Sequence, residues 1–401
     1  MNNLSYIYMT LTLCVCLLMM GVSVAEKSLI PGDLDGDMIV SAEELEEAKG
    51  ALERGDLADD ELALIKRIHE EYPRTVVDFS GREVTIYRPV ERVVCTASQH
   101  IESLRSLRVP AETIVGIPEG ANREAYFAEF AAVPSIGHFY EADVERILEL
   151  QPDLIIAHPG PGPGGNSLEE LLGRMRVSGV PVISLKCNIP ETYPDEMRAL
   201  GKIFERAEEA EEFIQFYEGV LQGISARTAS IPPEGRPKVY TEWKPYNTNS
   251  ILDMGEVEMA GGVHIFAGGR PVREVESEAV MVSDPDVIIR LVWDRDYDAI
   301  ASDDISSFTD ATSEILGRPE LVGVKAVKEG RVYAMASPFW TYLPGSSCRH
   351  FIGVAYMAKW FYPDLFEDLD PQAIHQRYLT QFQGLDYDLE ERGAFAYPPP
   401  A

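Results

Sequence analysis

The sequence predicts an α/β protein with two lobes, one long α-helix that bridges them and a small helical appendage at the N-terminus. Strand and helix patterns alternate after Pro73, which indicates parallel sheets flanked by helices. A short helix–turn–strand unit occurs twice, which indicates two similarly built lobes. The 401 residues exceed what one small core needs and suffice for two lobes and an appendage.

The first 25 residues carry no charged side chain, and an apolar run extends from Leu11 to Met20. Small residues precede Glu26, so residues 1–25 resemble a secretory signal peptide that is cleaved near Ala25. The segment lacks the usual leading Lys or Arg, and an uncleaved N-terminal anchor is the alternative. In both cases we expect an exported protein, either periplasmic or held at the cell surface.

Residues 26–72 form the predicted appendage, which contains an acidic loop with the spacing of a calcium site. Oxygen donors fall at loop positions one, three, five, seven, nine and twelve, namely Asp33, Asp35, Asp37, the carbonyl of Ile39, Ser41 and Glu44. The loop and the helix after it resemble an EF-hand, and more closely one loop of a dockerin repeat. Met38 departs from this pattern, because position six normally holds Gly for a sharp turn.

Two interpretations of this loop stay open in the sequence. Under the first it binds Ca²⁺, and under the second it is an acidic helix start for which Ser41 is the N-cap. A dockerin pairs two such loops, but the segment from Gly55 to Leu62 has too few ligands to be the second. Docking to a cohesin-type partner is therefore a minor hypothesis.

The first lobe is predicted to span residues 75–190. The segments 75–79 and 83–87 have the pattern of a hairpin, and an apolar strand at 92–96 leads into a helix. A further apolar strand covers 113–117, so strand and helix alternate from this point.

The repeated unit marks both lobes. Glu145 is followed seven residues later by Pro152-Asp153 and an apolar strand, and Glu278 is followed seven residues later by Pro285-Asp286 and another. Each copy has the pattern of a short helix, a turn and a buried strand. The second copy lies in a predicted second lobe, residues 236–383.

A long amphipathic stretch separates the two copies. Apolar residues recur at helical spacing through residues 191–230, which predicts one bridging helix on the order of 50 Å long. The proline-rich segment 231–237 ends it. Residues 384–401, which end in Tyr-Pro-Pro-Pro-Ala, are expected to form an extended tail.

Several segments occur in the order and spacing of a known family. They are Val90-Glu-Arg-Val-Val94, Val133-Pro-Ser-Ile-Gly137, Asp143-Val-Glu-Arg-Ile147 with Pro152-Asp-Leu-Ile-Ile156, Met259-Ala-Gly-Gly-Val263 and Val327-Lys-Glu-Gly-Arg-Val-Tyr333. Over about residues 75 to 380 the chain resembles the periplasmic solute-binding proteins of ABC importers for iron-siderophores, haem and cobalamin. The resemblance implies two Rossmann-like lobes joined by a rigid helix, with a ligand held in the cleft between them.

Ligands of parallel α/β sheets bind outside the carboxyl ends of the strands. The side chains expected there, and proposed to bind ligand, are Ser98, Gln99, His138, Tyr140, Trp243, Lys244, Tyr246, Trp293, Trp340 and Tyr342. Aromatic walls suit a broad, flat ligand, and Lys244 could meet an anionic chelate. The sequence does not decide between a siderophore, a corrinoid and haem.

The resemblance also implies that one glutamate on each lobe docks to arginines of the membrane permease. The matching residues are Glu145 and Glu278, the pair that the repeat places at equivalent positions. The alternative role for each is to stabilise a helix by lying in its first turn.

Two other functions are weighed against chelate capture. A binding protein for free Zn²⁺ or Mn²⁺ could use imidazoles and carboxylates after strands, namely His100, His138, His158, Glu242 and Asp294. A calcium-dependent scaffold protein at the cell surface would use the acidic loop for assembly. The sequence contains neither His-Glu-x-x-His nor Gly-x-Ser-x-Gly, so we expect no enzyme, and a net charge of −31 argues against nucleic acid.

Overall fold

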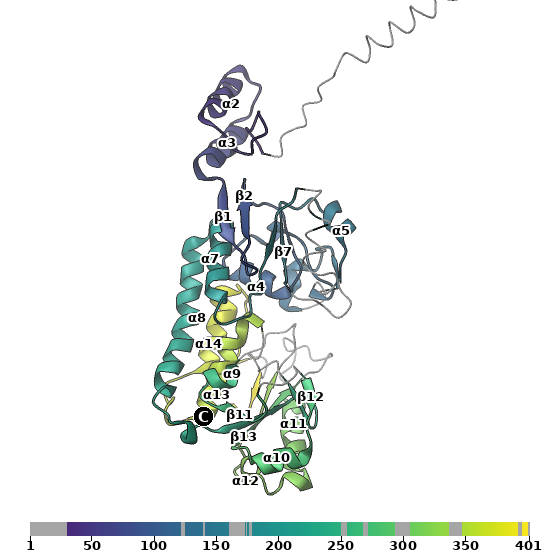
Figure 1. Cartoon of the computed structure of the whole chain (residues 1–401), viewed down its shortest axis with the longest axis vertical. Helices are drawn as coiled ribbons and strands as arrows, with labels where there is room; N and C mark the ends of the chain where they lie inside the picture. The colour runs from purple at the N-terminus through teal and green to yellow at the C-terminus, as the bar shows by residue number, and fades with distance from the viewer. Residues whose placement is uncertain are drawn as a thin grey trace, which may run out of the picture. The chain divides into compact units, whose positions relative to one another are not determined.

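The computed structural model describes residues 30–121, 125–138, 141–159, 173, 175, 179–249, 255–267, 272–292, 305–336, 347–391 and 395–399 (Figure 1). The chain divides into two compact units, one of residues 1–74 with 85–89 and the other of residues 75–84 with 90–401. The predicted signal peptide, residues 1–25, lies outside the described residues. Among the helices within those ranges, none is both long enough and apolar enough to cross a bilayer.

The appendage is helical, as predicted. Its two helices, α2 (Ala42–Arg54) and α3 (Asp59–Glu71), pack against each other. The buried face between them consists of Leu45, Ala48, Ile65 and Ile68. Gly55 ends α2 with a φ of 78°, a left-handed conformation that glycine adopts without steric cost.

The predicted hairpin forms the ribbon of β1 (Arg74–Val77) and β2 (Glu83–Ile86). Asp78 holds its turn, because the Oδ1 atom accepts hydrogen bonds from the backbone N–H groups of Ser80 and Arg82, both at 2.9 Å. The N–H of Phe79 donates to the carbonyl of Ser184 at 2.8 Å, which attaches the turn to the sheet of the first lobe.

The first lobe contains a parallel sheet in the order β4-β3-β7-β8. Its strands are β3 (Val93–Cys95), β4 (Ile114–Gly116), β7 (Leu154–Ala157) and β8 (Val182–Ser184). The other described elements of this lobe are α4 (Ser98–Ser106), η1 (Ala111–Thr113), η3 (Ala125–Phe130), β5 (Gly137–His138), β6 (Glu141–Ala142) and α5 (Val144–Glu149). Strands β3, β7 and β8 are buried along their whole length, which explains their uninterrupted apolar sequences.

The second lobe contains a sheet in the order β11-β9-β13-β14-β15, in which only the last pair is antiparallel. Its strands are β9 (Lys238–Glu242), β11 (Val263–His264), β13 (Val287–Val292), β14 (Val332–Ala336) and β15 (Ala396–Tyr397). A separate antiparallel pair is β10 (Asn247–Asn249) with β12 (Val272–Glu274). The helical elements are η4 (Pro233–Gly235), α9 (Glu256–Met259), α10 (Ser277–Ser283), α11 (Ser306–Leu316), η6 (Pro319–Leu321) and α12 (Lys325–Lys328). The extended tail expected at residues 384–401 thus supplies an edge strand of this sheet.

The two copies of the repeat have the same local structure. The residue before the proline of each copy has a left-handed conformation, with φ of 47° at Gln151 and 44° at Asp284. The carboxylate after each Pro then accepts a hydrogen bond from the backbone at the start of the neighbouring strand, Asp153 from Arg92 at 2.9 Å and Asp286 from Lys238 at 2.8 Å. The repeat therefore relates α5 to α10, β7 to β13 and β3 to β9.

The prediction of one continuous helix over residues 191–230 is wrong in its bounds. The segment forms two helices, α7 (Tyr193–Ile203) and α8 (Ala207–Thr228), separated by Glu205 at a φ of 59°. The two helices pack against each other as an antiparallel pair, with the Tyr193 ring 5.5 Å from that of Tyr217. Only α8, about 33 Å long from its 22 residues, is the long bridging helix (Figure 1).

The C-terminal elements return to the first lobe. They are η7 (Ser347–Arg349), α13 (His350–Phe361), α14 (Pro371–Arg377) and the π-helical turn η8 (Tyr378–Phe382). The hydroxyl of Tyr378 donates to Glu102 Oε2 of α4 at 2.9 Å, and Gln383 Nε2 donates to the carbonyl of Glu102 at 3.1 Å. The end of the segment assigned to the second lobe therefore packs on the first lobe, beside the bridging helix.

Candidate functional site

The carboxyl end of β3 leads directly into α4, and this junction carries two of the predicted ligand residues. Ser98 and Gln99 lie in the first turn of α4, and both side chains are buried. The N-cap residue, Ala97, provides no side-chain acceptor for the first N–H groups of the helix. Such a helix start presents donors and a partial positive charge.

Two further polar side chains follow the neighbouring strands β7 and β8. The backbone N–H of His158 donates to Thr96 Oγ1 at 2.9 Å, which ties the ends of β3 and β7 together. Burial, and then the charge of Lys186, lowers the pKa of His158 to about 4, so this imidazole is neutral at pH 7. Lys186 lies 4.7 Å from the ring centroid of Phe79.

Sequence analysis did not select Lys186. The signal that could have identified it is its position directly after the apolar residue Leu185, which follows β8. His138 lies on β5 and is exposed, while Tyr140 lies outside the described residues.

The carboxyl end of β9 carries the predicted pair Trp243 and Lys244. The indole Nε1 donates to Asn247 Oδ1 at 2.9 Å, and the N–H of Asn247 donates to the carbonyl of Lys244 at 2.9 Å. The Lys244 ammonium lies 4.8 Å from the Trp243 ring centroid. In this turn a cation thus lies over one face of an indole ring, and the pair suits a ligand with a flat apolar surface and negative charge.

Tyr246 makes contacts that the sequence did not predict. Its hydroxyl donates to Glu320, and its ring lies 4.7 Å beneath the Arg318 guanidinium. Burial, and then the hydrogen bond to Glu320, raises the pKa of Tyr246. The side chain is thus held by contacts within the protein, and the expectation that it contacts ligand stays a prediction. The remaining predicted ligand residues, Trp293, Trp340 and Tyr342, lie outside the described residues.

The paired glutamates are exposed in the first turns of equivalent helices, Glu145 in α5 and Glu278 in α10. Within the described part of the chain neither carboxylate makes an ion pair. Three residues later each helix exposes a large apolar side chain, Leu148 at 40% and Met281 at 36%. Residues three apart share a helix face, so each lobe presents a carboxylate next to an apolar side chain.

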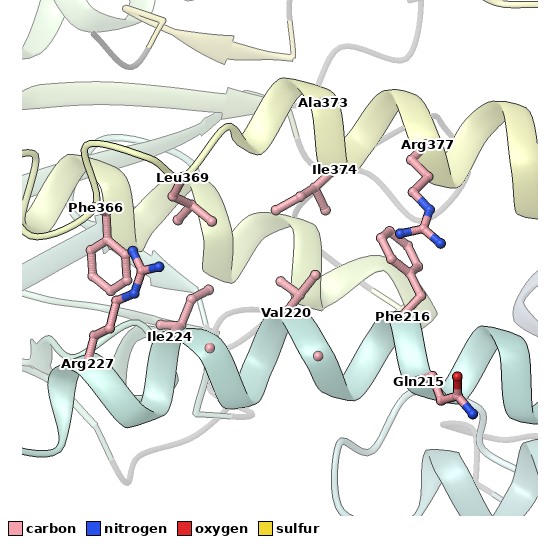
Figure 2. A pocket seen from close by; sticks show the side chains of 12 residues that line it. Gln215, Phe216, Val220, Ile224, Arg227, Phe366, Leu369, Ala373, Ile374 and Arg377 are labelled. Carbon is pink, nitrogen blue, oxygen red and sulfur yellow. The ribbon is translucent and has the colours of Figure 1, made fainter.

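A groove of about 460 Å³ lies elsewhere, between α8 and the segment from Phe366 to Arg377. Figure 2 shows arginines at its two ends, Arg227 beside Phe366 and Arg377 beside Phe216. Arg227 is neutralised by Asp368, with N–O distances of 2.5 and 2.8 Å. None of the groove's lining residues follows a strand, so the groove is not part of the strand-end site.

The sequence profile of the periplasmic binding proteins matches residues 93–338, more than half of the chain. The chain belongs to the periplasmic binding protein family. An uncharacterized ABC transporter substrate-binding lipoprotein of Bacillus subtilis is 22% identical over 322 residues, covering 78% of this chain and 93% of that protein. A vitamin B12-binding protein of Vibrio cholerae is 25% identical over 278 residues, covering 61% of this chain and 96% of that protein.

The fold of this periplasmic binding protein is shared with solved structures. A TroA-like periplasmic binding protein of Veillonella parvula superposes with a TM-score of 0.66 at 23% identity, covering 81% of this chain and 99% of that chain. The protein is accordingly the substrate-binding component of an ABC importer, located outside the cytoplasm and working with a membrane permease. Its relatives are solute-binding proteins and not enzymes, in agreement with the sequence expectation.

The alternative hypothesis was a site for free Zn²⁺ or Mn²⁺ with five candidate ligands. In the structure of this periplasmic binding protein, two of these residues are not available to a metal ion. His100 is fully buried, its Nε2 lies 2.9 Å from the carbonyl of Leu185, and burial lowers its pKa to about 3. Glu242 is fully buried and already accepts hydrogen bonds from Arg290 and Arg318. Asp294 lies outside the described residues. These positions correct the expectation that His100 and Glu242 could hold Zn²⁺ or Mn²⁺.

The acidic loop has a compact arrangement of carboxylates. Asp33, Asp35 and Asp37 each bring one oxygen within 4.8 Å of the others, and no other such group of His, Cys, Asp and Glu occurs among the described residues. Met38 has a φ of 74°, so position six is left-handed although it is not glycine. The departure seen in the sequence therefore does not prevent the turn.

The remaining side chains of the loop form a capping box. Glu44 Oε2 accepts from the Ser41 backbone at 2.8 Å, and Ser41 Oγ accepts from the Glu44 backbone at 3.2 Å. Glu44 Oε1 also accepts from the N–H of Leu34 at 2.6 Å, which closes the loop. The hydrogen bond from the Ser41 backbone is the main cause that lowers the pKa of Glu44. The N-cap interpretation is thus confirmed, and it coexists with the carboxylate cluster.

Proposed function

We propose that this protein captures an anionic metal chelate, such as a ferric siderophore, and delivers it to the permease. The observation that carries the proposal is the turn at the end of β9, where the Lys244 ammonium lies 4.8 Å from the Trp243 ring centroid. Aromatic side chains contact flat apolar ligand surfaces, and an adjacent cation favours those with negative charge.

The first lobe supports the same class of ligand. Lys186 lies after β8, and its positive charge contributes to the lowered pKa of His158 at the end of β7. The donor-rich start of α4 at Ser98 lies at the end of β3, in the same sheet. Cationic groups at strand ends are informative here, because the whole chain carries a net charge of −31 and would otherwise repel an anion.

A titration of the purified exported protein tests the ligand class. Ferric enterobactin, ferrichrome, haem, cyanocobalamin, MnCl₂ and ZnCl₂ would be compared by calorimetry. We expect the anionic ferric catecholate to bind most tightly, with an affinity that falls as salt rises. Tightest binding of cyanocobalamin would instead match the activity named for the Vibrio cholerae relative, and binding of the free cations alone would overturn the proposal.

We further propose that Glu145 and Glu278 dock to arginines of the permease, with Leu148 and Met281 packing at the same contacts. The support is the equivalent placement of a carboxylate and an exposed apolar side chain on α5 and α10. Bidentate pairs of arginine with carboxylate give such contacts strength and direction. Retention of the permease by the immobilised protein, compared with an E145Q/E278Q variant, tests this docking.

We propose in addition that the loop of Asp33, Asp35 and Asp37 binds Ca²⁺. The cluster supplies oxygen ligands at the spacing of a calcium loop, and Met38 supplies the left-handed turn. Calorimetry with CaCl₂ on the exported protein and on a D33N/D35N variant tests the site, with MgCl₂ as control. Heat in the variant equal to that of the parent protein would refute it. A Ca²⁺-dependent cohesin contact would favour the scaffold function.

We infer that residues 1–25 are removed during export. The support is the uncharged apolar run and the small residues before Glu26. N-terminal sequencing of the exported protein should begin near Glu26, whereas an intact Met1 on membrane-bound protein would establish the anchor alternative.

A further inference from the structure

The last residue of β9, Glu242, is a fully buried carboxylate with five hydrogen-bond donors around it. Its Oε1 accepts from Arg290 at 2.5 Å and from Arg318 at 2.6 Å. Its Oε2 accepts from Arg318 at 3.0 Å, from the Tyr240 hydroxyl at 3.0 Å and from the Tyr246 backbone at 3.1 Å. A buried charge of this kind is tolerated only when it is paired and hydrogen-bonded in this way.

The arginines around Glu242 also lie close to a second carboxylate, Glu314 of α11. Glu314 accepts from Arg318 Nε at 2.9 Å and from Nη2 at 2.7 Å. Burial alone would lower the pKa of Arg318, but the hydrogen bonds to Glu314 and Glu242 raise it above its usual value. The guanidinium is therefore permanently charged, and its position is determined by two carboxylates.

This charge cluster reaches the surface through Tyr246. The backbone N–H of Tyr246 donates to Glu242, its ring packs on Arg318, and its hydroxyl donates to Glu320. Tyr246 has a φ of 55°, an unfavourable conformation for a bulky residue. Three separate contacts thus hold a conformation that the residue would otherwise avoid.

The turn fixed in this way is the one that carries Trp243 and Lys244. Trp243 follows Glu242 directly, and its N–H donates to the Asn247 carbonyl at 3.2 Å. The chain from 243 to 246 is consequently clamped at Glu242 on one side and at Tyr246 on the other. A ligand contact made by Trp243 depends on this geometry, because a displacement near 1 Å is enough to spoil a binding site.

We propose that Glu242, with Arg318, is a positioning residue that sets ligand affinity by fixing the Trp243–Lys244 turn. The inference rests on the proposed function in so far as this turn contacts the ligand. Glu242 itself reaches no ligand, since both of its oxygens are occupied by protein donors.

An E242Q variant tests the proposal, with E329Q as the control because Glu329 is an exposed glutamate of the same lobe. Glutamine at this position cannot accept from two guanidinium groups as a carboxylate does. The ligand-independent readout is iodide quenching of Trp243, obtained as the difference between each protein and its W243F counterpart. We expect E242Q to alter this quenching and E329Q to leave it unchanged. Unaltered quenching in folded E242Q would overturn the proposal.

The second readout is the affinity for ferric enterobactin. We expect E242Q to weaken it about tenfold or more, equivalent to at least about 1.4 kcal/mol. Altered Trp243 quenching without a change in affinity would also overturn the proposal. The affinity of W243F in the same titration then shows whether Trp243 contacts the ligand at all.

If E242Q does not fold, the Y246F variant tests the proposal in its place, because it loses only the hydroxyl contact with Glu320. We expect a smaller loss of affinity for Y246F, and no change would contradict the clamp.

Discussion

The two lobes are alike at one end of their sheets and different at the other. At the amino ends of β3 and β9, Asp153 and Asp286 make the same hydrogen bonds to the backbone of the neighbouring strand, and the helices that precede them carry Glu145 and Glu278. The carboxyl ends share no such pattern.

At the carboxyl end of β3 the chain enters α4 through small and uncharged residues, Thr96, Ala97 and Ser98. At the carboxyl end of β9, a buried glutamate and two arginines support a turn with an indole and an ammonium group. Under the proposed function, this difference has a simple reason. The duplicated unit keeps its structure where we propose that both lobes dock to the permease, and it differs where we propose that a single, asymmetric ligand is recognised.

Removing the matched carboxylates should have the largest effect. In an E145Q/E278Q variant we expect substrate uptake by the importer to fall more than about tenfold, because two charge-assisted contacts with the permease are lost. Affinity for ligand in solution should be unchanged, since neither carboxylate is among the side chains proposed to contact ligand. Uptake at the level of the parent protein would show that Glu145 and Glu278 do not dock to the permease.

Truncating the side chains of Trp243 or Lys244, at the carboxyl end of β9, should reduce ligand affinity and leave docking to the permease intact. We expect W243A to weaken binding of ferric enterobactin about tenfold, as for a central aromatic contact. K244M should weaken it about threefold at low salt and less at high salt, because an exposed charge is screened. Calorimetry at two salt concentrations measures both effects, and equal losses for the neutral cyanocobalamin would contradict a charge-based role.

The first lobe should be the more acid-sensitive of the two through His158. Its pKa is about 4 in the folded protein against 6.5 when unfolded, so only the unfolded chain binds a proton between these values. Stability from this group is complete above pH 6.5 and is lost as pH falls towards 4, by about 3 kcal/mol at most. Urea unfolding of H158Q between pH 7 and 4 should show a flatter pH dependence than the parent protein. Parallel curves would refute the assignment.

The two equivalent aspartates of the repeat, Asp153 and Asp286, should contribute similarly to stability. We expect D153N and D286N each to lower the free energy of unfolding by about 0.5 to 1.5 kcal/mol, because each weakens a charge-assisted hydrogen bond from the backbone of the neighbouring strand. The loss for D286N should be the larger, since Lys325 also binds Asp286 at 2.7 Å. Urea denaturation checks the order, and a neutral D153N would break the equivalence of the two copies.

The smallest effect concerns the packing of α7 on the bridging helix α8. A Cβ at Gly201 would lie 2.8 Å from the Ala210 Cβ and 3.0 Å from the Arg206 carbonyl, whereas one at Gly223 of α8 meets nothing within 4 Å. We expect G201A to destabilise the protein by about 1 kcal/mol and G223A to stabilise it by up to about 1 kcal/mol. Thermal unfolding of the two variants measures both signs. A stabilised G201A would contradict the close packing of α7 on α8.

The sequence predicted the features that depend on local pattern. The Pro-Asp turns of the repeat could be recognised because proline and aspartate there begin a buried strand, and both turns have the same hydrogen bonds. Trp243 and Lys244 were selected because they follow an apolar strand. The donor spacing of the acidic loop was likewise visible in one short segment.

Features that depend on distant contacts could not be predicted. The break at Glu205 has no proline or glycine at that position, and the apolar spacing continues on both sides of it. The contacts of Tyr246 could not be predicted because its partners, Arg318 and Glu320, lie more than seventy residues further along the chain. The return of Tyr378 to Glu102 connects residues 276 positions apart.

The most direct test of the account is the position of a bound ferric siderophore in crystals of the exported protein, located from the anomalous scattering of its iron. The account predicts that the chelate packs on the Trp243 ring and lies within reach of Lys244, with its other side towards Ser98. Iron in the groove between α8 and α14, or on the exposed faces of α5 and α10, would contradict it.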